Sequence, residues 1–307
     1  MMKTTNALRF RCLGWMAATL LLGPLFLLGS CGNQPSPPLP FATFPLTGDH
    51  PVRWLTAGPD GNLWLAENPP DQLGRFTLPG KLTEFPIPAS STLRSITGGP
   101  DGNLWFTELE AGKIGRLTPK GKLTEFALPT VHGGFSSGPV WLITGPDGNL
   151  WFTETFANQI GRITPQGTVT EFSLPETRGA RQLGEIITGP DGNVWFTDPQ
   201  QNTVGRITSL GVVTEFPLPT PQRSPDEITL GPDANLWFTE FDANKLGRIT
   251  PGGKLTEFPL LAFVQDPTVI TAGADRHLWF LALQQHSALT SQVLLVRFTL
   301  PHLRSAA

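Results

Sequence analysis

Carboxylates and guanidinium groups are the side chains of this 307-residue chain whose types and spacing could do chemistry. The carboxylates recur after short strand-like segments at Glu67, Glu108, Glu154, Asp198 and Glu240, and again at Glu84, Glu125, Glu171, Glu215 and Glu257. The arginines recur just as regularly, at Arg75, Arg116, Arg162, Arg206, Arg248 and Arg297. Paired carboxylates could exchange protons or bind a metal ion. Groups present in nearly every copy of a repeat are more simply explained by ion pairs between neighbouring strands, which we expect here.

Charges that differ from copy to copy are better candidates for a site. They gather where the innermost strands are predicted to begin, at Arg53, Arg94, Glu185, Asp226, Glu227 and Asp266. Two guanidinium groups facing several carboxylates could clamp a zwitterionic or carboxylate-bearing ligand, because arginine offers bidentate geometry. The same charges could equally do no more than solvate the loop ends. A divalent cation could lie among Glu185, Asp226 and Asp266, although nothing in their spacing specifies one.

Aromatic and histidine residues add a few single-copy candidates. Trp54 and Trp141 occur on inner strands of only two copies, where they could stack on a ligand or pack in the core. His50 and His132 lie in connectors between strands. We expect these connectors on the face of the molecule where the innermost strands surround a central funnel. Together with Glu185 and Asp226, the two histidines are candidates for proton transfer, although an exposed loop histidine is the simpler interpretation.

Other reaction classes have no support in the sequence. His277 is predicted in a turn of the opposite face, His286 in an insertion and His302 in the tail, so none is assigned a catalytic role. The chain has no phosphate-binding loop, no motif centred on a nucleophilic serine and no Cys/His metal signature.

A repeat must position these residues. The run Gly-Pro-Asp-Gly-Asn-Leu-Trp-Phe-Thr-Glu recurs with its tryptophan at 64, 105, 151, 195, 237 and 279, at intervals of 41 to 46 residues. That is the length of one four-stranded propeller blade, and tryptophans at equivalent positions are expected to wedge between blades. Each of the first five copies predicts an inner strand, a tight turn that begins Gly-Pro-Asp, and three further strands.

The sixth copy lacks its outer strand. Residues 42–47 resemble the outer-strand residues 214–219, so the N-terminal segment at about 41–47 is expected to complete the last blade. The fold class predicted is therefore all-β, a six-bladed β-propeller of four-stranded blades. It spans residues 41–301, followed by a tail at 302–307, and its termini close the ring.

The first forty residues predict targeting to the cell envelope. Lys3, Arg9 and Arg11 precede an apolar stretch from Leu13 to Leu28, which ends in Leu-Gly-Ser-Cys. This resembles a bacterial lipoprotein signal peptide at residues 1–30, with Cys31 lipidated and residues 31–40 forming a Pro-rich tether. A membrane-spanning helix is the alternative, but the stretch is shorter than the roughly 20 residues needed. We expect a lipid anchor on the extracytoplasmic face of the membrane.

Cysteine count and charge exclude further classes. Cys12 and Cys31 are the only cysteines, so a domain beginning after Cys31 has neither a disulfide nor a thiolate site. Loss of residues 1–30 removes three basic and no acidic residues, which changes the formal charge from −3 to −6. Nucleic acid is therefore not an expected partner, because a basic surface is missing.

The run GPDGNLWFTE followed by IGRITPxGxxTEFPLP resembles the virginiamycin B lyase family, also called streptogramin B lyases. The resemblance implies a β-propeller, typically seven-bladed, whose characterised members open a cyclic depsipeptide antibiotic at its ester bond by elimination with magnesium. It also implies catalytic histidines at the starts of inner strands. The corresponding positions here are Arg53, Arg94, Val140, Gly184, Asp226 and Thr268, and none is histidine.

Two function classes follow. The first is a non-catalytic propeller that binds a small peptidic or carboxylate-bearing ligand, or a protein partner, at its funnel through the inner-strand residues above. The second is an enzyme, either a diverged lyase opening a cyclic ester or a metal-dependent lactonase or esterase. No cofactor is certain, magnesium being implied only by the resemblance. We expect a monomer that meets the membrane only through its lipid anchor.

Overall fold

The computed structural model describes residues 51–77, 80–88, 91–129, 131–132, 135–136, 138–175, 182–220, 224–287 and 290–300. Predictions about the signal peptide, Cys31, the tether, His50, the strand at 41–47 and the tail lie outside these residues. Within the described part, no helix is long and apolar enough to cross a membrane.

Six antiparallel sheets follow one another along the chain. Sheet 1 contains β1 (Val52–Ala57), β2 (Leu63–Glu67), β3 (Gln72–Thr77) and β4 (Lys81–Pro86). Sheet 2 contains β5 (Leu93–Gly98), β6 (Leu104–Glu108), β7 (Lys113–Leu117) and β8 (Leu123–Ala127). Sheet 3 contains β11 (Pro139–Thr144), β12 (Leu150–Glu154), β13 (Gln159–Ile163) and β14 (Val169–Ser173).

The remaining sheets have the same order. Sheet 4 contains β15 (Ile186–Thr188), β16 (Val194–Asp198), β17 (Thr203–Ile207) and β18 (Val213–Pro217). Sheet 5 contains β19 (Pro225–Leu230), β20 (Leu236–Glu240), β21 (Lys245–Ile249) and β22 (Leu255–Pro259). Sheet 6 has β23 (Gln265–Ala272), β24 (Leu278–Ser287) and β25 (Thr290–Phe298). A short hairpin, β9 (Val131–His132) and β10 (Phe135–Ser136), lies between sheets 2 and 3.

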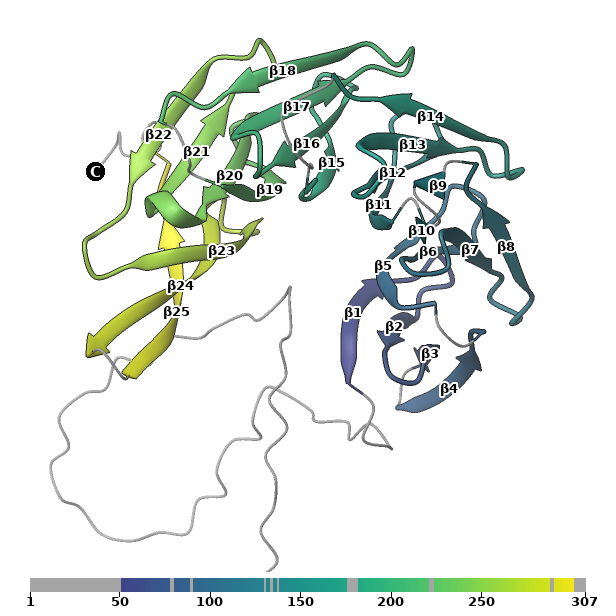
Figure 1. Cartoon of the computed structure of the whole chain (residues 1–307). Helices are drawn as coiled ribbons and strands as arrows, with labels where there is room; N and C mark the ends of the chain where they lie inside the picture. The colour runs from purple at the N-terminus through teal and green to yellow at the C-terminus, as the bar shows by residue number, and fades with distance from the viewer. Residues whose placement is uncertain are drawn as a thin grey trace, which may run out of the picture.

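The sheets follow an arc in Figure 1, with their first strands on its inner side. Neighbouring first strands contact one another in the order β1, β5, β11, β15, β19 and β23. The predicted all-β class and six repeats are confirmed, and the sixth sheet has three described strands, as its sequence indicated. Sheets 1 and 6 stand at the two ends of the arc (Figure 1). The predicted closure of the ring therefore stays a prediction.

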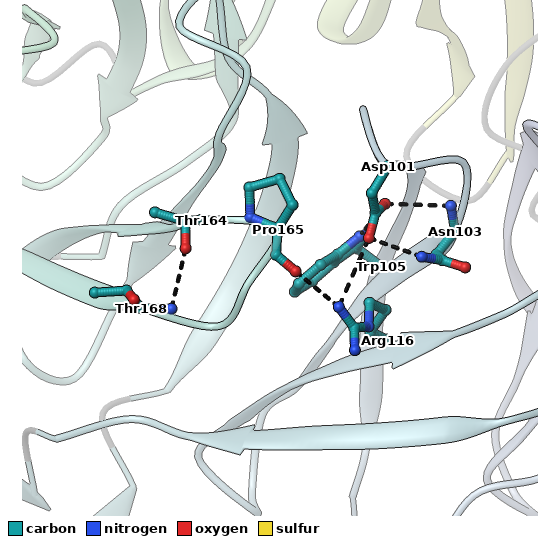
Figure 2. Close-up of polar contacts among 7 residues, drawn as sticks. All are labelled: Asp101, Asn103, Trp105, Arg116, Thr164, Pro165 and Thr168. Carbon is teal, nitrogen blue, oxygen red and sulfur yellow. Dashed lines mark hydrogen bonds and ion pairs between the residues drawn. The ribbon is translucent and has the colours of Figure 1, made fainter.

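The repeated turn fastens each tryptophan in place. In sheet 2, one carboxylate oxygen of Asp101 accepts hydrogen bonds from the Asn103 amide at 3.2 Å and from the Trp105 indole at 2.9 Å. Gly102 has a φ of 74°, a left-handed conformation that favours glycine. Figure 2 shows this turn around Trp105, whose ring is fully buried. The Pro-Asp-Gly motif thus builds the turn and orients the core residue at once.

Tryptophan rings pack between sheets, as predicted. Trp105 of sheet 2 lies in a cluster with Leu142, Leu150 and Phe152 of sheet 3. It also stacks on Phe126 of its own outer strand, with ring centroids 5.5 Å apart. The equivalent tryptophans of sheets 1, 3, 4 and 5 are buried to the same degree. Each junction therefore buries large apolar surface, which is the main stabilising term in such an array.

The arginines have different partners from those predicted. The Arg116 guanidinium carbon lies 5.4 Å from the ring centroids of both Trp105 and Phe126. Its Nη1 donates to the Pro165 carbonyl of sheet 3 at 2.7 Å and lies 3.8 Å from an Asp101 carboxylate oxygen (Figure 2). We call this set the arginine latch. It joins a sheet to the next one in the chain.

Latches of the same kind lie at other junctions. Equivalent arginines donate to a carbonyl of the following sheet, in the pairs Arg75 with Pro119, Arg162 with Ser209, and Arg206 with Pro251. The predicted pairing of these arginines with the repeated glutamates is wrong in sheet 2. There Arg116 lies opposite Thr124, whereas Glu125 lies opposite Gly115, and adjacent positions of a strand point to opposite faces.

The repeated acids that end the second strands are buried, and those of sheet 2 have partners other than arginine. Glu108, Glu154, Asp198 and Glu240 are fully buried at the ends of second strands. In sheet 2 the outer-strand Glu125 pairs with the third-strand Lys113 at 3.2 Å, and Ser91 donates to Glu108 at 2.8 Å. Burial is the main cause that raises the pKa of Glu108 to about 7, and the nearby Glu125 charge adds to it. Glu108, Glu154, Asp198 and Glu240 therefore lie inside the sheets and do not line the pocket described below.

Candidate functional site

The innermost strands are irregular where a site was predicted. In β5 the pairing with β6 skips from Leu93 to Ile96, so Arg94 lies in a bulge. Comparable irregularities lie between Pro139 and Leu142 in β11 and between Pro225 and Ile228 in β19. A bulge leaves one residue out of the ladder and redirects its side chain. The second residues of these strands, Arg94, Val140 and Asp226, are thereby turned out of the ladder and toward the funnel.

A buried threonine fixes each bulge. The Thr107 hydroxyl accepts a hydrogen bond from the Ser95 amide of its own sheet at 2.9 Å. The same hydroxyl donates to the Val140 carbonyl of the next sheet, also at 2.9 Å. In sheet 4, Thr197 donates to the Asp226 carbonyl at 2.5 Å. These contacts hold the strand starts of adjacent sheets in register, so the residues facing the funnel have fixed backbones.

A pocket of about 410 Å³ lies among sheets 2 to 5 on this face. Arg94 of β5, Trp141 of β11 and Asp226 of β19 line it, which brings together three of the predicted site residues. Val140 and Gly184 also line it. Four of the six positions that correspond to the family's histidines, namely those of Arg94, Val140, Gly184 and Asp226, therefore face one cavity.

The pocket has no room for a larger side chain at one of these positions. A Cβ added to Gly184 would lie 2.3 Å from the Thr197 hydroxyl oxygen and 3.2 Å from the Asp226 carbonyl oxygen. Contacts this short require the Thr197 side chain or the backbone to shift. Glycine at 184 therefore lets the chain before β15 pass close to Thr197 and to the start of β19, and a histidine there would require Thr197 or the backbone to shift.

Other predicted residues lie near the pocket without lining it. Trp54 of β1 contacts Trp141 edge to face, with ring centroids 5.0 Å apart and planes at 74°. Arg53 is exposed and does not line the pocket, and neither does Asp266, whose backbone amide donates to Asn244 in sheet 5. His132 lies in β9, whose side chains are not described.

Three carboxylates form an acidic group beside the pocket. Burial, together with the charge of Glu227, raises the pKa of Glu185 well above its usual range. Burial is also the main cause that raises the pKa of Asp226, and it raises the pKa of Glu227 to about 7 with help from the Asp226 charge. Glu185 accepts a hydrogen bond from the Ile228 amide at 2.8 Å. One wall of the site can therefore change its charge near neutral pH.

The described residues do not fit a magnesium site. Among them, no three His, Cys, Asp or Glu side chains are grouped so that they could hold a metal ion. Asp266, one of the three acids considered for a cation, belongs to sheet 6 and does not line the pocket with Asp226. No chemical step is therefore derived through magnesium.

Sequence reasoning missed the aromatic rim of the pocket. Phe156 and Phe241 line it from the connectors between second and third strands of sheets 3 and 5, and both are exposed. Gln182 and Asp242 add polar groups. The signal was present, because a phenylalanine in an exposed loop is unusual. A search limited to the strand starts could not find it.

Solved structures place the chain among propellers that include lyases. It is 37% identical to a selenomethionine-substituted virginiamycin B lyase from Staphylococcus aureus, covering 81% of this chain and 85% of that one, with a TM-score of 0.69. It is 38% identical, with the same coverage and a TM-score of 0.70, to a catalytically inactive histidine-to-alanine variant of that lyase with quinupristin. An auxiliary nutrient binding protein from Bacteroides thetaiotaomicron matches at 13% identity, with coverage of 75% and 66% and a TM-score of 0.50, which shows a shared fold alone.

A comparison with curated proteins finds no match. The model of the virginiamycin B lyase family matches residues 41–306, which is nearly all of the chain beyond the predicted signal and tether. The match includes the Trp-centred repeat, the latch arginines and the bulged strand starts. The chain belongs to the virginiamycin B lyase family.

Proposed function

We propose that this protein is a binding propeller whose ligand is a small peptidic molecule with a carboxylate and an apolar or aromatic group. The observation that carries the proposal is the pocket that joins Arg94, Asp226 and Trp141. Its volume of about 410 Å³ is in the range of small-molecule sites. A protein partner that inserts a short chain end would meet the same groups.

Each group has a distinct part in recognition. The Arg94 guanidinium offers two parallel N–H donors to a carboxylate, and such charge-assisted pairs are stronger than neutral hydrogen bonds. Asp226 can accept from an amine or amide of the ligand. Trp141, Phe156 and Phe241 supply aromatic surface, which binds apolar groups with little loss of conformational entropy. A molecule that carries all three features fits the pocket better than a sugar or a metal complex.

A diverged lyase is the second candidate. The 37–38% identity to virginiamycin B lyases favours it, as does one property of the site. A carboxyl whose pKa is about 7, such as that of Glu227, exchanges a proton near neutral pH and could act as a base for elimination. The absence of histidine at the six strand starts weighs against this candidate, since it removes the usual proton-transfer group.

Calorimetry and product analysis test both candidates together. A streptogramin B antibiotic and a series of linear peptides are titrated into the protein, and the antibiotic is also incubated with it and magnesium. We expect binding without ring opening, as followed by chromatography and mass spectrometry. Opening of the ester by the wild type would establish the second candidate in place of the first.

Variants then locate the site. Arg94→Gln and Asp226→Asn are each expected to weaken binding about tenfold or more, because each leaves a charged ligand group without its partner. Arg53→Gln is the matched control, since Arg53 is an exposed inner-strand arginine outside the pocket. Wild-type affinity in both pocket variants would place the ligand elsewhere.

The cell location and the ring belong to the same proposal. We propose that Cys31 carries a lipid and holds the propeller on the extracytoplasmic face, and that the six sheets close into a ring. Metabolic labelling with a radioactive fatty acid should mark the wild type and not Cys31→Ser. An unlabelled wild-type protein would contradict the anchor and leave the binding proposal intact.

A further inference from the structure

The turns of the sheets form a surface at the end of the strands opposite the funnel. First-to-second and third-to-fourth turns lie at the same end of a sheet, because successive strands run in opposite directions. Arg116 contacts one turn of each kind, since its Nη1 donates to Pro165 and lies 3.8 Å from Asp101 (Figure 2). We call this surface the turn face. Its described turns are residues 58–62, 99–103, 145–149, 189–193, 231–235 and 273–277, and residues 80–81, 118–122, 164–168, 208–212 and 250–254.

The lysines of the described chain divide into two groups. Lys113 and Lys245 begin third strands, and each pairs with a glutamate of the neighbouring outer strand. Every other described lysine is exposed on the turn face, at Lys81, Lys120, Lys122 and Lys254. Within the part of the chain that the structure describes, none of these four ammonium groups has a carboxylate partner.

The aspartates of the turn face are already matched by latch arginines. An arginine Nη1 lies 3.5 to 3.9 Å from the turn aspartate of its own sheet in the pairs Arg116 with Asp101, Arg162 with Asp147, Arg206 with Asp191, and Arg248 with Asp233. The lysines therefore add positive charge to a face whose acids are largely neutralised. The acids that line the pocket, Asp226 and Asp242, lie at the opposite end of the sheets.

A further basic residue takes a place that the repeat gives to glycine. Arg276 is exposed and has a φ of 62°. The equivalent residues of sheets 1 to 4 are Gly61, Gly102, Gly148 and Gly192, and a Cβ added to any of them would meet no atom within 4 Å. A side chain at this position thus points into solvent, and its backbone conformation favours glycine. What arginine adds here is charge on the turn face.

The turn face also carries two apolar residues that the fold does not use. Leu210 and Val212, in the turn between β17 and β18, are 87% and 60% exposed. Their counterparts in the same turn of sheet 3 are Gln166 and Thr168, and both counterparts in sheet 2 are lysine. The turn therefore folds with polar residues at these positions, and the apolar pair occurs in sheet 4 alone among the described turns.

We propose that the turn face docks on an anionic lipid bilayer, with its lysines and Arg276 against the phosphate groups and Leu210 and Val212 in the interfacial layer. Basic residues are attracted to an anionic membrane surface, and short apolar side chains add burial at the headgroup boundary. The basic residues belong to sheets 1, 2, 5 and 6, so an extended surface reaches all of them, whereas the apolar area is small for a protein partner.

This docking rests on the membrane location proposed above, and it goes beyond the expectation that the chain meets the membrane only through its anchor. It also fixes an orientation. The turn face lies on the bilayer, and the funnel at the other end of the strands opens away from it. The pocket lined by Arg94, Trp141 and Asp226 is then accessible to a ligand from outside.

Amine footprinting on the full chain tests the orientation. The protein is reconstituted into vesicles of phosphatidylcholine alone or of an equal mixture with phosphatidylglycerol, acetylated, and analysed by mass spectrometry. We expect Lys81, Lys120, Lys122 and Lys254 to react at least about threefold more slowly on the anionic vesicles, and high salt to remove the difference. Lys113 and Lys245 are the internal references, because both lie in strand ion pairs.

Variants separate docking from a general effect of the vesicles. Leu210→Gln combined with Val212→Thr gives sheet 4 the turn residues of sheet 3, so it should fold as the wild type and lose roughly half of the protection. Leu261→Gln is the matched control, since Leu261 is 64% exposed in the outer-to-inner connector between sheets 5 and 6. It should leave the protection unchanged.

Three outcomes would overturn the docking. They are equal reactivity on both kinds of vesicle, equal protection on neutral vesicles, and protection of Lys113 and Lys245 in place of the turn lysines. Fatty-acid labelling of Cys31 tests the anchor separately. A labelled chain whose turn lysines react equally on both vesicles would contradict the docking and leave the anchor intact.

Discussion

The junctions between sheets and the strand starts around the pocket differ in one instructive way. At the junctions the same residue types recur, and their contacts repeat to within a few tenths of an ångström, as in the arginine-to-ring distances of 5.4 to 5.8 Å. At the strand starts the backbone recurs, with its bulge, but the side chains are Arg94, Val140, Gly184 and Asp226. Family membership is therefore read from the junctions, whereas function must be read from the strand starts.

The largest expected effect comes from breaking a junction. Trp105→Ala removes a fully buried ring that packs between sheets 2 and 3, and should cost about 3–5 kcal/mol of unfolding free energy. Denaturant titration measures this loss. Under conditions where the variant is folded, its ligand affinity should equal that of the wild type, since Trp105 does not line the pocket. Loss of ligand binding without loss of stability would contradict the view that the junctions stabilise the fold and the strand starts bind the ligand.

Loss of the arginine latch should cost less unfolding free energy than loss of the tryptophan beside it. Arg116→Ala removes one charge-assisted hydrogen bond and two cation–π contacts, which together should cost about 2–3 kcal/mol. Arg116→Lys should recover only part of this, because lysine lacks the planar fork that stacks between the rings. If Arg116→Lys were as stable as the wild type, charge alone would account for the latch.

Glu227→Gln tests the strand starts through the pH dependence of protein stability. The folded-state pKa of Glu227 is raised to about 7 from 4.5, so the folded protein binds more protons than the unfolded chain between these values. Stability therefore falls as pH rises from about 4.5 to about 7, and above this window the charged carboxylate remains destabilising. We expect the variant to be more stable than the wild type by about 1–3 kcal/mol at pH 8 and nearly equal at pH 4. Urea unfolding at both pH values checks this, and a pH-independent difference would contradict it.

The smallest effect tests whether Trp54 supports the site. Trp54→Leu removes the edge-to-face contact with Trp141, worth about 0.5–1.5 kcal/mol. Because Trp141 lines the pocket, affinity should fall by a few fold while the thermal midpoint changes little. Trp54→Phe should retain most of the affinity. Equal losses of affinity in both variants would indicate that Trp54 itself contacts the ligand.

Much of the fold was predictable because its signals are local. The Gly-Pro-Asp-Gly turn and the tryptophan that follows it act within five residues, through Asp101 and Trp105. The arginine partners were not predictable in this way. Arg116 and Pro165 are 49 positions apart, and only the placement of one sheet on the next brings the guanidinium to that carbonyl. The rule that opposite charges pair across neighbouring strands predicted a glutamate partner, but Glu125 lies on the opposite face of the sheet from Arg116.

The site was predictable in part for a related reason. Alignment of the repeats identified Arg94, Trp141 and Asp226, because residues equivalent by repeat lie at equivalent places around the inner side of the arc. It could not exclude Asp266, whose sheet lies at the end of the arc. The alignment also could not show which connectors reach the pocket. Phe156 and Phe241 were therefore found only in the three-dimensional structure.

Every described latch points the same way along the chain. The arginine belongs to one sheet and the acceptor carbonyl to the sheet that follows it, from Arg75 and Pro119 to Arg206 and Pro251. The array is thus head-to-tail, like a polymer of identical links. Gain or loss of one whole link by gene duplication or deletion leaves every remaining joint unchanged. Propellers of different size can therefore arise within one family without any new interface having to evolve.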